Sequence, residues 1–227
     1  MRRLITLSLL CSLAGCIPPS ENRAPTTYRH PAPPPPPPYR SYAPHPNANV
    51  AQCEAGLSQS GARFTPLPDQ SFSPSCTAYG AVQLTYIAPG IAITNTKALR
   101  CEVALPLSQW LQGPVQIAAK RWFGARVVRL DSMGTYSCRN VIGNAASSNK
   151  LSEHARANAV DVGGFLLSDG RRITVLNGWR GTEDEAGFLH EIHDSACRRF
   201  ITVLSPDYNA AHANHLHFDM GGSNYCR

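Results

Sequence analysis

The chain has 227 residues, of which 43% are hydrophobic and 16% are charged, a composition that suits one globular domain rather than a disordered chain or a coiled coil. No run of 18 apolar residues is present, which excludes a helix that spans a membrane. The formal charge is +6, and the basic residues are scattered along the chain, which favours an acidic partner such as a cell-wall polymer over nucleic acid.

The N-terminal residues are typical of an export signal. Two arginines precede a short apolar stretch, residues 4–13, and small residues then lead to Cys16. This arrangement resembles the lipobox of bacterial lipoproteins, so we expect cleavage after residue 15 and lipidation of Cys16. By analogy with enterobacterial sorting, Ile17 in place of Asp favours the periplasmic face of the outer membrane. Plain cleavage beside an incidental Cys16 is the alternative.

A proline-rich segment follows the expected lipidation site. Twelve of the 19 prolines lie between residues 17 and 48, including an unbroken run at 33–38. Such a segment favours an extended, semi-rigid tether, and a ligand for a proline-binding module is the alternative. The sequence therefore predicts a signal peptide at 1–15, a lipidated cysteine with its tether at 16–49, and a folded domain at 50–227.

Hydrophobic periodicity within the folded domain predicts both helices and strands. In chain order, helices are expected at 98–111, where Pro106 is an interruption, and at 114–123; strands at 125–130, 160–167 and 173–176; a helix at 184–200; and a last strand at 215–220. Because helices come first and strands gather later, we expect an α+β fold with a small antiparallel sheet and helices on one side.

Six cysteines remain in the domain once Cys11 of the signal and Cys16 are set aside. In an exported chain they predict three disulfides, and no C-x-x-C pair points to a cysteine-rich zinc site. The sequence does not choose the pairing, although proximity favours Cys53 with Cys76. The six are Cys53, Cys76, Cys101, Cys138, Cys197 and Cys226.

Two segments, 152–163 and 212–219, carry polar residues that packing does not explain. Asp161 lies within an apolar, strand-like run, where an unpaired carboxylate is costly to bury, so it needs a cation or a metal as its partner. On a strand, His215, His217 and Asp219 project to the same side. Imidazole and carboxylate groups are the ligands of a catalytic zinc with an open fourth position.

These segments also resemble known families. The pattern S-x-H-x-x-x-x-A-x-D, which contains His154 and Asp161, and the late H-x-H resemble the zinc D-Ala-D-Ala metallopeptidases and the H-x-H peptidoglycan endopeptidases. With residues 134–140 and 206–212 added, the domain resembles the bacterial extensin-like C-terminal family.

The resemblance implies a zinc D-Ala-D-Ala peptidase-like core with Zn2+ held by His154, Asp161 and His217. It also implies that Arg139 polarises the scissile carbonyl or stabilises the oxyanion. Ser152 is then expected to support a ligand or to contact the substrate.

The general base is where this sequence departs from the family. Many relatives have an acid three residues before the last ligand, but here the residue is Asn214, whose amide cannot accept a proton from water. In H-x-H relatives the first histidine lies by the metal, which makes His215 the expected base. Asp219 either orients a histidine or is solvated, and His212 either supports the site or hydrogen-bonds its own loop.

The predicted function is an exported lipoprotein zinc metallopeptidase that hydrolyses peptide stems or cross-links of peptidoglycan, with endopeptidase action favoured over carboxypeptidase action. The expected partners are peptidoglycan stem peptides and a membrane reached through the lipid anchor, and no nucleic acid. A non-catalytic peptidoglycan-binding lipoprotein that retains the zinc fold is the alternative, and Asn214 favours it. His190 and His193 are expected on a helix surface, and the three tryptophans in packing.

Overall fold

The computed structural model describes residues 48–143, 145–222 and 224–227. The predicted signal peptide, the lipidation site and nearly all of the predicted tether lie outside the described residues. Within the described ranges, no helix has the length and apolar character needed to cross a membrane.

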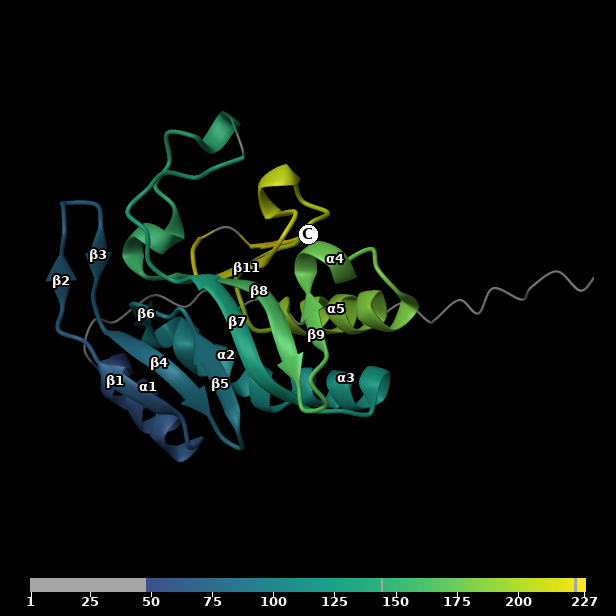
Figure 1. The fold of residues 1–227 in the computed structure, drawn as a ribbon. Coiled ribbons are helices and arrows are strands. Elements are labelled where there is room, and N and C mark those ends of the chain that lie inside the picture. The colour runs from purple at the N-terminus through teal and green to yellow at the C-terminus, as the bar shows by residue number, and fades with distance from the viewer. Residues whose placement is uncertain (1–47, 144, 223) are drawn as a thin grey trace, which may run out of the picture. The chain divides into compact units, whose positions relative to one another are not determined.

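A large sheet forms the centre of the described domain (Figure 1). Its strands are β1 (Arg63–Pro66), β4 (Ala81–Ile87), β5 (Ile91–Thr94), β6 (Leu99–Arg100), β7 (Val127–Gly134), β8 (Ala159–Leu167), β9 (Arg172–Thr174), β10 (Thr202–Leu204), β11 (Leu216–Asp219) and β12 (Tyr225–Cys226). The order is β1-β4-β5-β7-β8-β11-β10-β12, with β6 beside β4 and β9 beside β8. Among the described strands, only the β5–β7 and β10–β12 pairs are parallel, so the predicted antiparallel character is confirmed. The prediction of a small sheet is wrong.

The order of elements also differs from the prediction, because several strands precede the first predicted helix. In β4, Val82 and Leu84 are buried while Gln83 and Thr85 are exposed, the alternation of a strand with one face on a core. The later strands lie close to their predicted positions. The strand expected at 173–176 ends at Thr174, whose hydroxyl accepts a hydrogen bond from the Asn177 amide and so starts a short helix, α4 (Val175–Gly178).

The longer helices are α1 (Ala48–Gln59), α2 (Cys101–Gln112), α3 (Pro114–Phe123) and α5 (Glu183–Ala196). They lie on one side of the sheet in Figure 1, as predicted. Pro106 stays inside α2 and does not end it. Pro114 is the first residue of α3, a position where a backbone N–H would have no partner within the helix. Gly124 ends the helix in the left-handed conformation.

A single main core joins these helices to the inner face of the sheet. Trp110 of α2, Phe165 of β8, Phe188 of α5 and Phe218 of β11 are all fully buried in it. The Trp110 indole N–H donates to the Ile192 carbonyl at 3.1 Å, which satisfies its polar atom within the core. Because Phe218 faces this core, its neighbours in β11 face the opposite side of the sheet.

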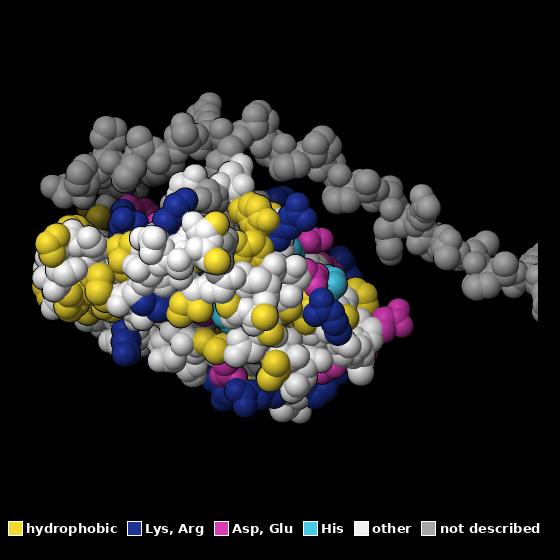
Figure 2. Space-filling model, turned by 90° about the horizontal axis from the view of Figure 1, so that it is seen from above, with side chains coloured by type: hydrophobic (Ala, Val, Ile, Leu, Met, Phe, Trp, Pro, Cys, Tyr) yellow, Lys and Arg dark blue, Asp and Glu magenta, His cyan; other side chains and the backbone are white. Residues whose placement is uncertain are grey.

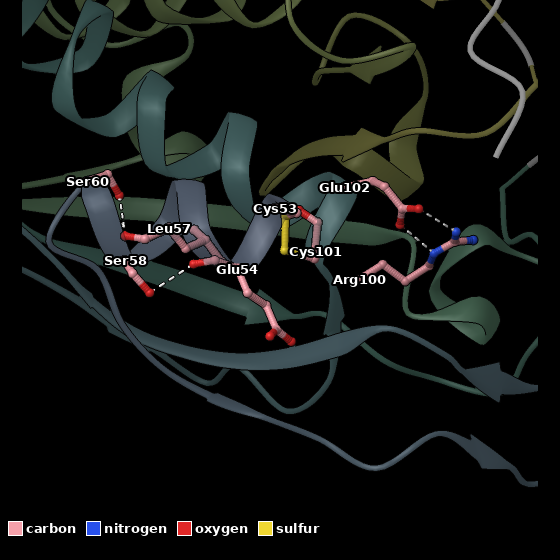
Figure 3. Close-up of a disulfide and its surroundings, with 8 residues drawn as sticks. All are labelled: Cys53, Glu54, Leu57, Ser58, Ser60, Arg100, Cys101 and Glu102. Atoms are coloured by element: carbon pink, nitrogen blue, oxygen red, sulfur yellow. Dashed lines mark hydrogen bonds and ion pairs between the residues drawn. A yellow bond between two sulfur atoms is a disulfide. The ribbon is translucent and has the colours of Figure 1, made fainter. Parts of the chain in front are cut away.

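Three disulfides connect the described domain, as predicted, but the proposed pair Cys53–Cys76 is wrong. Cys53 of α1 bonds Cys101 at the start of α2, next to an ion pair between Arg100 and Glu102 (Figure 3). The other pairs are Cys76–Cys138 and Cys197–Cys226. Cys76 directly precedes β3 (Thr77–Ala78), which forms a two-stranded hairpin with β2 (Gln70–Ser71). This hairpin brings Cys76 to the segment after β7.

Candidate metal centre

The candidate site lies on the sheet face opposite the core. Asp161 of β8 and His217 of β11 are directly paired in the strand register. His154 comes from the short 3₁₀ helix η2 (Glu153–Arg156) in the connection between β7 and β8. The three side chains are separated by up to 63 positions in the sequence and meet because β8 and β11 are neighbours.

Three ligand atoms converge at this point. The Nε2 atom of His154 lies 3.1 Å from Oδ1 of Asp161 and 3.2 Å from Nδ1 of His217. The Nδ1 atom of His217 lies 2.9 Å from the same Asp161 oxygen. The side chains of His154, Asp161 and His217 are 3%, 13% and 10% exposed, so water does not separate them from one another.

The second nitrogen of each histidine already has an acceptor. Nδ1 of His154 lies 3.1 Å from the carbonyl oxygen of Thr135, and Nε2 of His217 lies 2.9 Å from Oδ2 of Asp219. Each of these nitrogens therefore carries the ring proton when the imidazole is neutral. The two nitrogens that face Asp161 then present lone pairs, so three acceptor atoms meet, an arrangement that a cation or a shared proton stabilises.

Zinc fits this arrangement. Tetrahedral zinc with nitrogen and oxygen ligands at about 2.0–2.1 Å places neighbouring ligand atoms about 3.3 Å apart. The three separations here are 2.9, 3.1 and 3.2 Å. Two imidazoles and one carboxylate, with a fourth direction open to the hollow beside them, match the donor set of catalytic zinc sites.

In the metal-free protein, a proton stands in for the cation. Burial disfavours the charge of Asp161, but hydrogen bonds and charge from His154 and His217 outweigh it and hold the pKa of Asp161 well below its ordinary value. Burial also disfavours the charge of His217, but Asp161 and Asp219 raise its pKa to about 9. The cluster is therefore built to hold positive charge.

Two further histidines flank these ligands. Nε2 of His215 lies 3.5 Å from Oδ1 of Asp161, and its Nδ1 lies 2.9 Å from the side-chain oxygen of Asn214. Burial lowers the pKa of His215, so the ring is neutral at neutral pH with Nε2 free to accept a proton. Burial and the nearby histidine charges lower the pKa of His212 to about 4.

A hollow of about 440 Å³ opens over these side chains. It lies between the connection after β7 and the loop before β11, which both rise from the sheet in Figure 1. Arg139 lines it, and its guanidinium donates to the Asn140 carbonyl at 3.3 Å. The Ser152 hydroxyl accepts a hydrogen bond from the His154 amide at 3.3 Å, so Ser152 positions the backbone of this candidate ligand.

The comparison with protein families matches residues 51–227 to the family described as "Extensin-like protein C-terminus". The chain belongs to this family. No curated protein and no solved structure matches it.

In this extensin-like domain, the contacts of Asp219 and His212 bear on the alternatives left open for these two residues. Asp219 orients a histidine, because its carboxylate bonds His217. His212 hydrogen-bonds its own loop through the Asn209 side-chain oxygen at 2.8 Å, and it also lines the hollow. Asn214 supports His215 and borders a second, neighbouring hollow.

One histidine prediction is wrong. His193 of α5 is 8% exposed rather than on the surface, because the helix face that carries it packs against Trp179. His193 also lies close to Cys197 and Cys226, but these two cysteines form a disulfide and offer no thiolate. Thr135 was not predicted as part of the site. It holds the His154 ring through its backbone carbonyl, which leaves no side-chain signal in the sequence.

Proposed function

We propose that this extensin-like domain is a zinc-dependent hydrolase of peptide bonds in peptidoglycan stems or cross-links. One observation carries the proposal. An oxygen of Asp161 meets a ring nitrogen of His154 and one of His217, and both nitrogens offer lone pairs because the other nitrogen of each ring already donates to an acceptor. Such a site pre-organises a cation, and the open hollow beside it gives a substrate access to that cation.

Different residues of the chain have different roles in the proposed hydrolysis. When bound, zinc supplies Lewis-acid polarisation of a peptide carbonyl and activation of water. His215 accepts a proton through Nε2, because its Nδ1 is held by Asn214. The Arg139 guanidinium, which reaches the same hollow, donates hydrogen bonds to the oxygen on which negative charge develops.

Cleavage within a peptide is favoured over removal of a terminal residue. A second hollow, of about 380 Å³, is bordered by Asn214, Met133 and Gly163. Gly163 lies two residues after Asp161 in β8, so both face the same side of the sheet. A substrate that lies in the first hollow and continues past Asn214 into the second would extend to both sides of the bond that is cut, which supports endopeptidase action.

The second candidate is a non-catalytic peptidoglycan-binding lipoprotein that retains the zinc fold. One observation favours it: Asn214 supplies an amide where an acid is expected, and the described acids of the hollow are already bonded to other side chains. In this case the site holds stem peptides without cutting them.

The N-terminal sequence supports placement in the bacterial cell envelope. We propose that Cys16 is lipidated, that the proline-rich segment is a tether, and that the domain faces the periplasm from the outer membrane. Palmitate labelling of the wild type and of Cys16→Ser tests the anchor. Label that persists in the variant contradicts lipidation at this residue.

The test of the activity is digestion of purified sacculi by the full chain with zinc, with a chelator, and with His154→Ala or His215→Ala. We expect chelator-sensitive release of peptides by the wild type alone, and mass spectrometry of the fragments identifies the bond. If the wild type binds zinc and sacculi but releases nothing, the binding function replaces the enzymatic one.

A further inference from the structure

The connection between β7 and β8 folds back on itself beside the candidate metal centre. Asn140 lies opposite Leu151 as in an antiparallel ladder, and the Val141 amide donates to the Lys150 carbonyl at 2.9 Å. We call the described residues 139–143 and 145–152 the arm. It rises from the sheet at the end of β7 (Figure 1).

The register of the arm places two cations on one side. The Ser152 amide donates to the Arg139 carbonyl at 3.1 Å, so Arg139 and Ser152 are opposite each other. Lys150, two residues before Ser152, points to the same side of the ladder. Arg139 and Lys150 are therefore diagonal neighbours, and the geometry of such pairs places their Cα atoms about 7–8 Å apart. Both residues line the hollow.

The acids of the hollow do not neutralise these cations. Asp161 and Asp219 are bonded to the candidate ligands. Glu153 accepts hydrogen bonds from Arg156 at 3.2 Å and from Asn158 at 2.6 Å. Within the described residues, neither cation of the arm has a carboxylate at ion-pair distance. Like charges on one face repel each other, and an anion between them relieves the repulsion.

Figure 2 shows the Lys and Arg side chains on one face of the molecule, seen from above. They occur at several places on this face and adjoin one another along the lower edge of the picture. Several of the other arginines are paired with acids, such as Arg180 with Asp207 and Arg121 with Glu191. Arg139 and Lys150 instead share one side of one hollow, and no described carboxylate lies at ion-pair distance from either.

We propose that Lys150 is a specificity-determining residue that binds a free carboxylate of the substrate peptide, next to the guanidinium of Arg139. The proposal rests on the proposed function, because it names the substrate class of the same site. That class is an acidic peptide with a free carboxylate near the bond that is cut. Stem peptides, whose acidic residues keep free carboxyl groups in the chain, have this chemistry.

The experiment compares two synthetic stem tetrapeptides, one with all carboxyl groups free and one with every carboxyl group converted to the amide. Binding to the zinc-loaded full chain is measured by calorimetry, and cleavage is measured by kcat/KM. The variants are Lys150→Met and Lys150→Arg, with Lys120→Met in α3 as the matched control, because Lys120 is exposed and does not line the hollow.

We expect Lys150→Met to weaken binding of the free peptide roughly tenfold and to leave the amidated peptide unchanged. Lys150→Arg is expected to keep the preference for the free peptide, and Lys120→Met to match the wild type. If the wild type binds or cuts both peptides and Lys150→Met leaves their ratio unaltered, the role of Lys150 is refuted while the proposed function stands. If the wild type binds neither peptide, the role of Lys150 is refuted, and the proposed function is decided separately by the digestion of sacculi.

Discussion

The Nε2 atom of His217 lies 2.9 Å from Oδ2 of Asp219, two residues further along β11. The two side chains share one face of the strand because side chains alternate. The carboxylate therefore fixes the ring proton of His217 on Nε2 and turns the Nδ1 lone pair toward Asp161. The orientation of this candidate ligand thus depends on a residue that does not itself reach the metal position.

Replacing this carboxylate is expected to weaken metal binding without removing a ligand. For Asp219→Asn we expect zinc affinity to fall by about 10- to 100-fold, because the amide carries no negative charge and holds the ring by a weaker hydrogen bond. Competition against a zinc-binding dye measures the change. Asp169→Asn, an exposed turn position paired with Arg171, is the matched control. Equal zinc affinity in Asp219→Asn and the wild type contradicts this role.

Zinc binding is expected to release a proton. In the metal-free protein the pKa of His217 is raised to about 9, so its imidazole is charged at neutral pH and must lose its proton before Nδ1 binds a metal. Apparent zinc affinity then rises about tenfold per pH unit between pH 6.5 and 8.5. Calorimetry in two buffers of different ionisation enthalpy counts the proton, and a count near zero contradicts the mechanism.

The same proton sets the pH dependence of the metal-free fold. Because the folded-state pKa of His217 lies above its ordinary value of 6.5, its contribution to the free energy of unfolding is complete below pH 6.5. This contribution is lost as the pH rises through about 9. Zinc-loaded protein does not hold this proton, so its stability should stay nearly level over this range, and the stabilisation by zinc, measured as the shift in Tm, is expected to grow with pH.

The sequence was most informative where a short pattern decides the structure. Pro114 and Gly124 bracket α3 at the predicted ends, because both act through local backbone geometry. The spacing of two between His217 and Asp219 fixes a shared strand face. A charged residue inside an apolar run, such as Asp161, predicted a buried partner. The structure has two such partners, His217 and His154.

The sequence was least informative where distant segments meet. The pairing of Cys76 with Cys138 depends on the path of a hairpin, which proximity along the chain does not reveal. The early strands are short and alternate in burial, so they lack the long apolar runs of β8. The contribution of Thr135 is a carbonyl oxygen, and every residue has one.

The disulfide Cys76–Cys138 is expected to hold the base of the arm, because Cys138 precedes Arg139. Replacing both cysteines by serine should lower the free energy of unfolding by about 4 kcal/mol from loop entropy alone. Removing Cys53–Cys101 should cost a similar amount. Only the first pair should speed hydrogen exchange at the Ser152 amide, which bonds the Arg139 carbonyl. Equal exchange in the two double variants contradicts this positioning role.

The tip of the arm touches the loop before β11 through a glycine. Gly143 has φ of +80°, and a Cβ there would collide with the Cβ of Ala211. The Asn209 amide also donates to the Gly143 carbonyl at 3.2 Å. Gly143→Ala should therefore destabilise the protein by about 2–4 kcal/mol, from left-handed backbone and steric overlap together.

The two causes are separable with a second variant. Ala211→Gly removes the atom that a side chain at Gly143 would meet, so the double variant should keep only the backbone cost of about 1–2 kcal/mol. Urea unfolding of the wild type, the two single variants and the double variant gives the four free energies of unfolding of this double-mutant cycle. Additive effects of the two substitutions would show that the arm and the loop do not meet.

An acid at position 214 tests the role of His215 directly. The Asn214 oxygen lies 2.9 Å from Nδ1 of His215, so Asn214→Asp places a negative charge beside this ring. A negative charge stabilises the imidazolium and raises the pKa of His215, which burial lowers in the native chain. If His215 is the general base, the acid limb of the kcat/KM profile should move up by about one pH unit and the plateau should rise. The matched control is Asn177→Asp, because Asn177 is exposed in α4 and does not line the first hollow. An unshifted acid limb in an active Asn214→Asp variant assigns the base to another group.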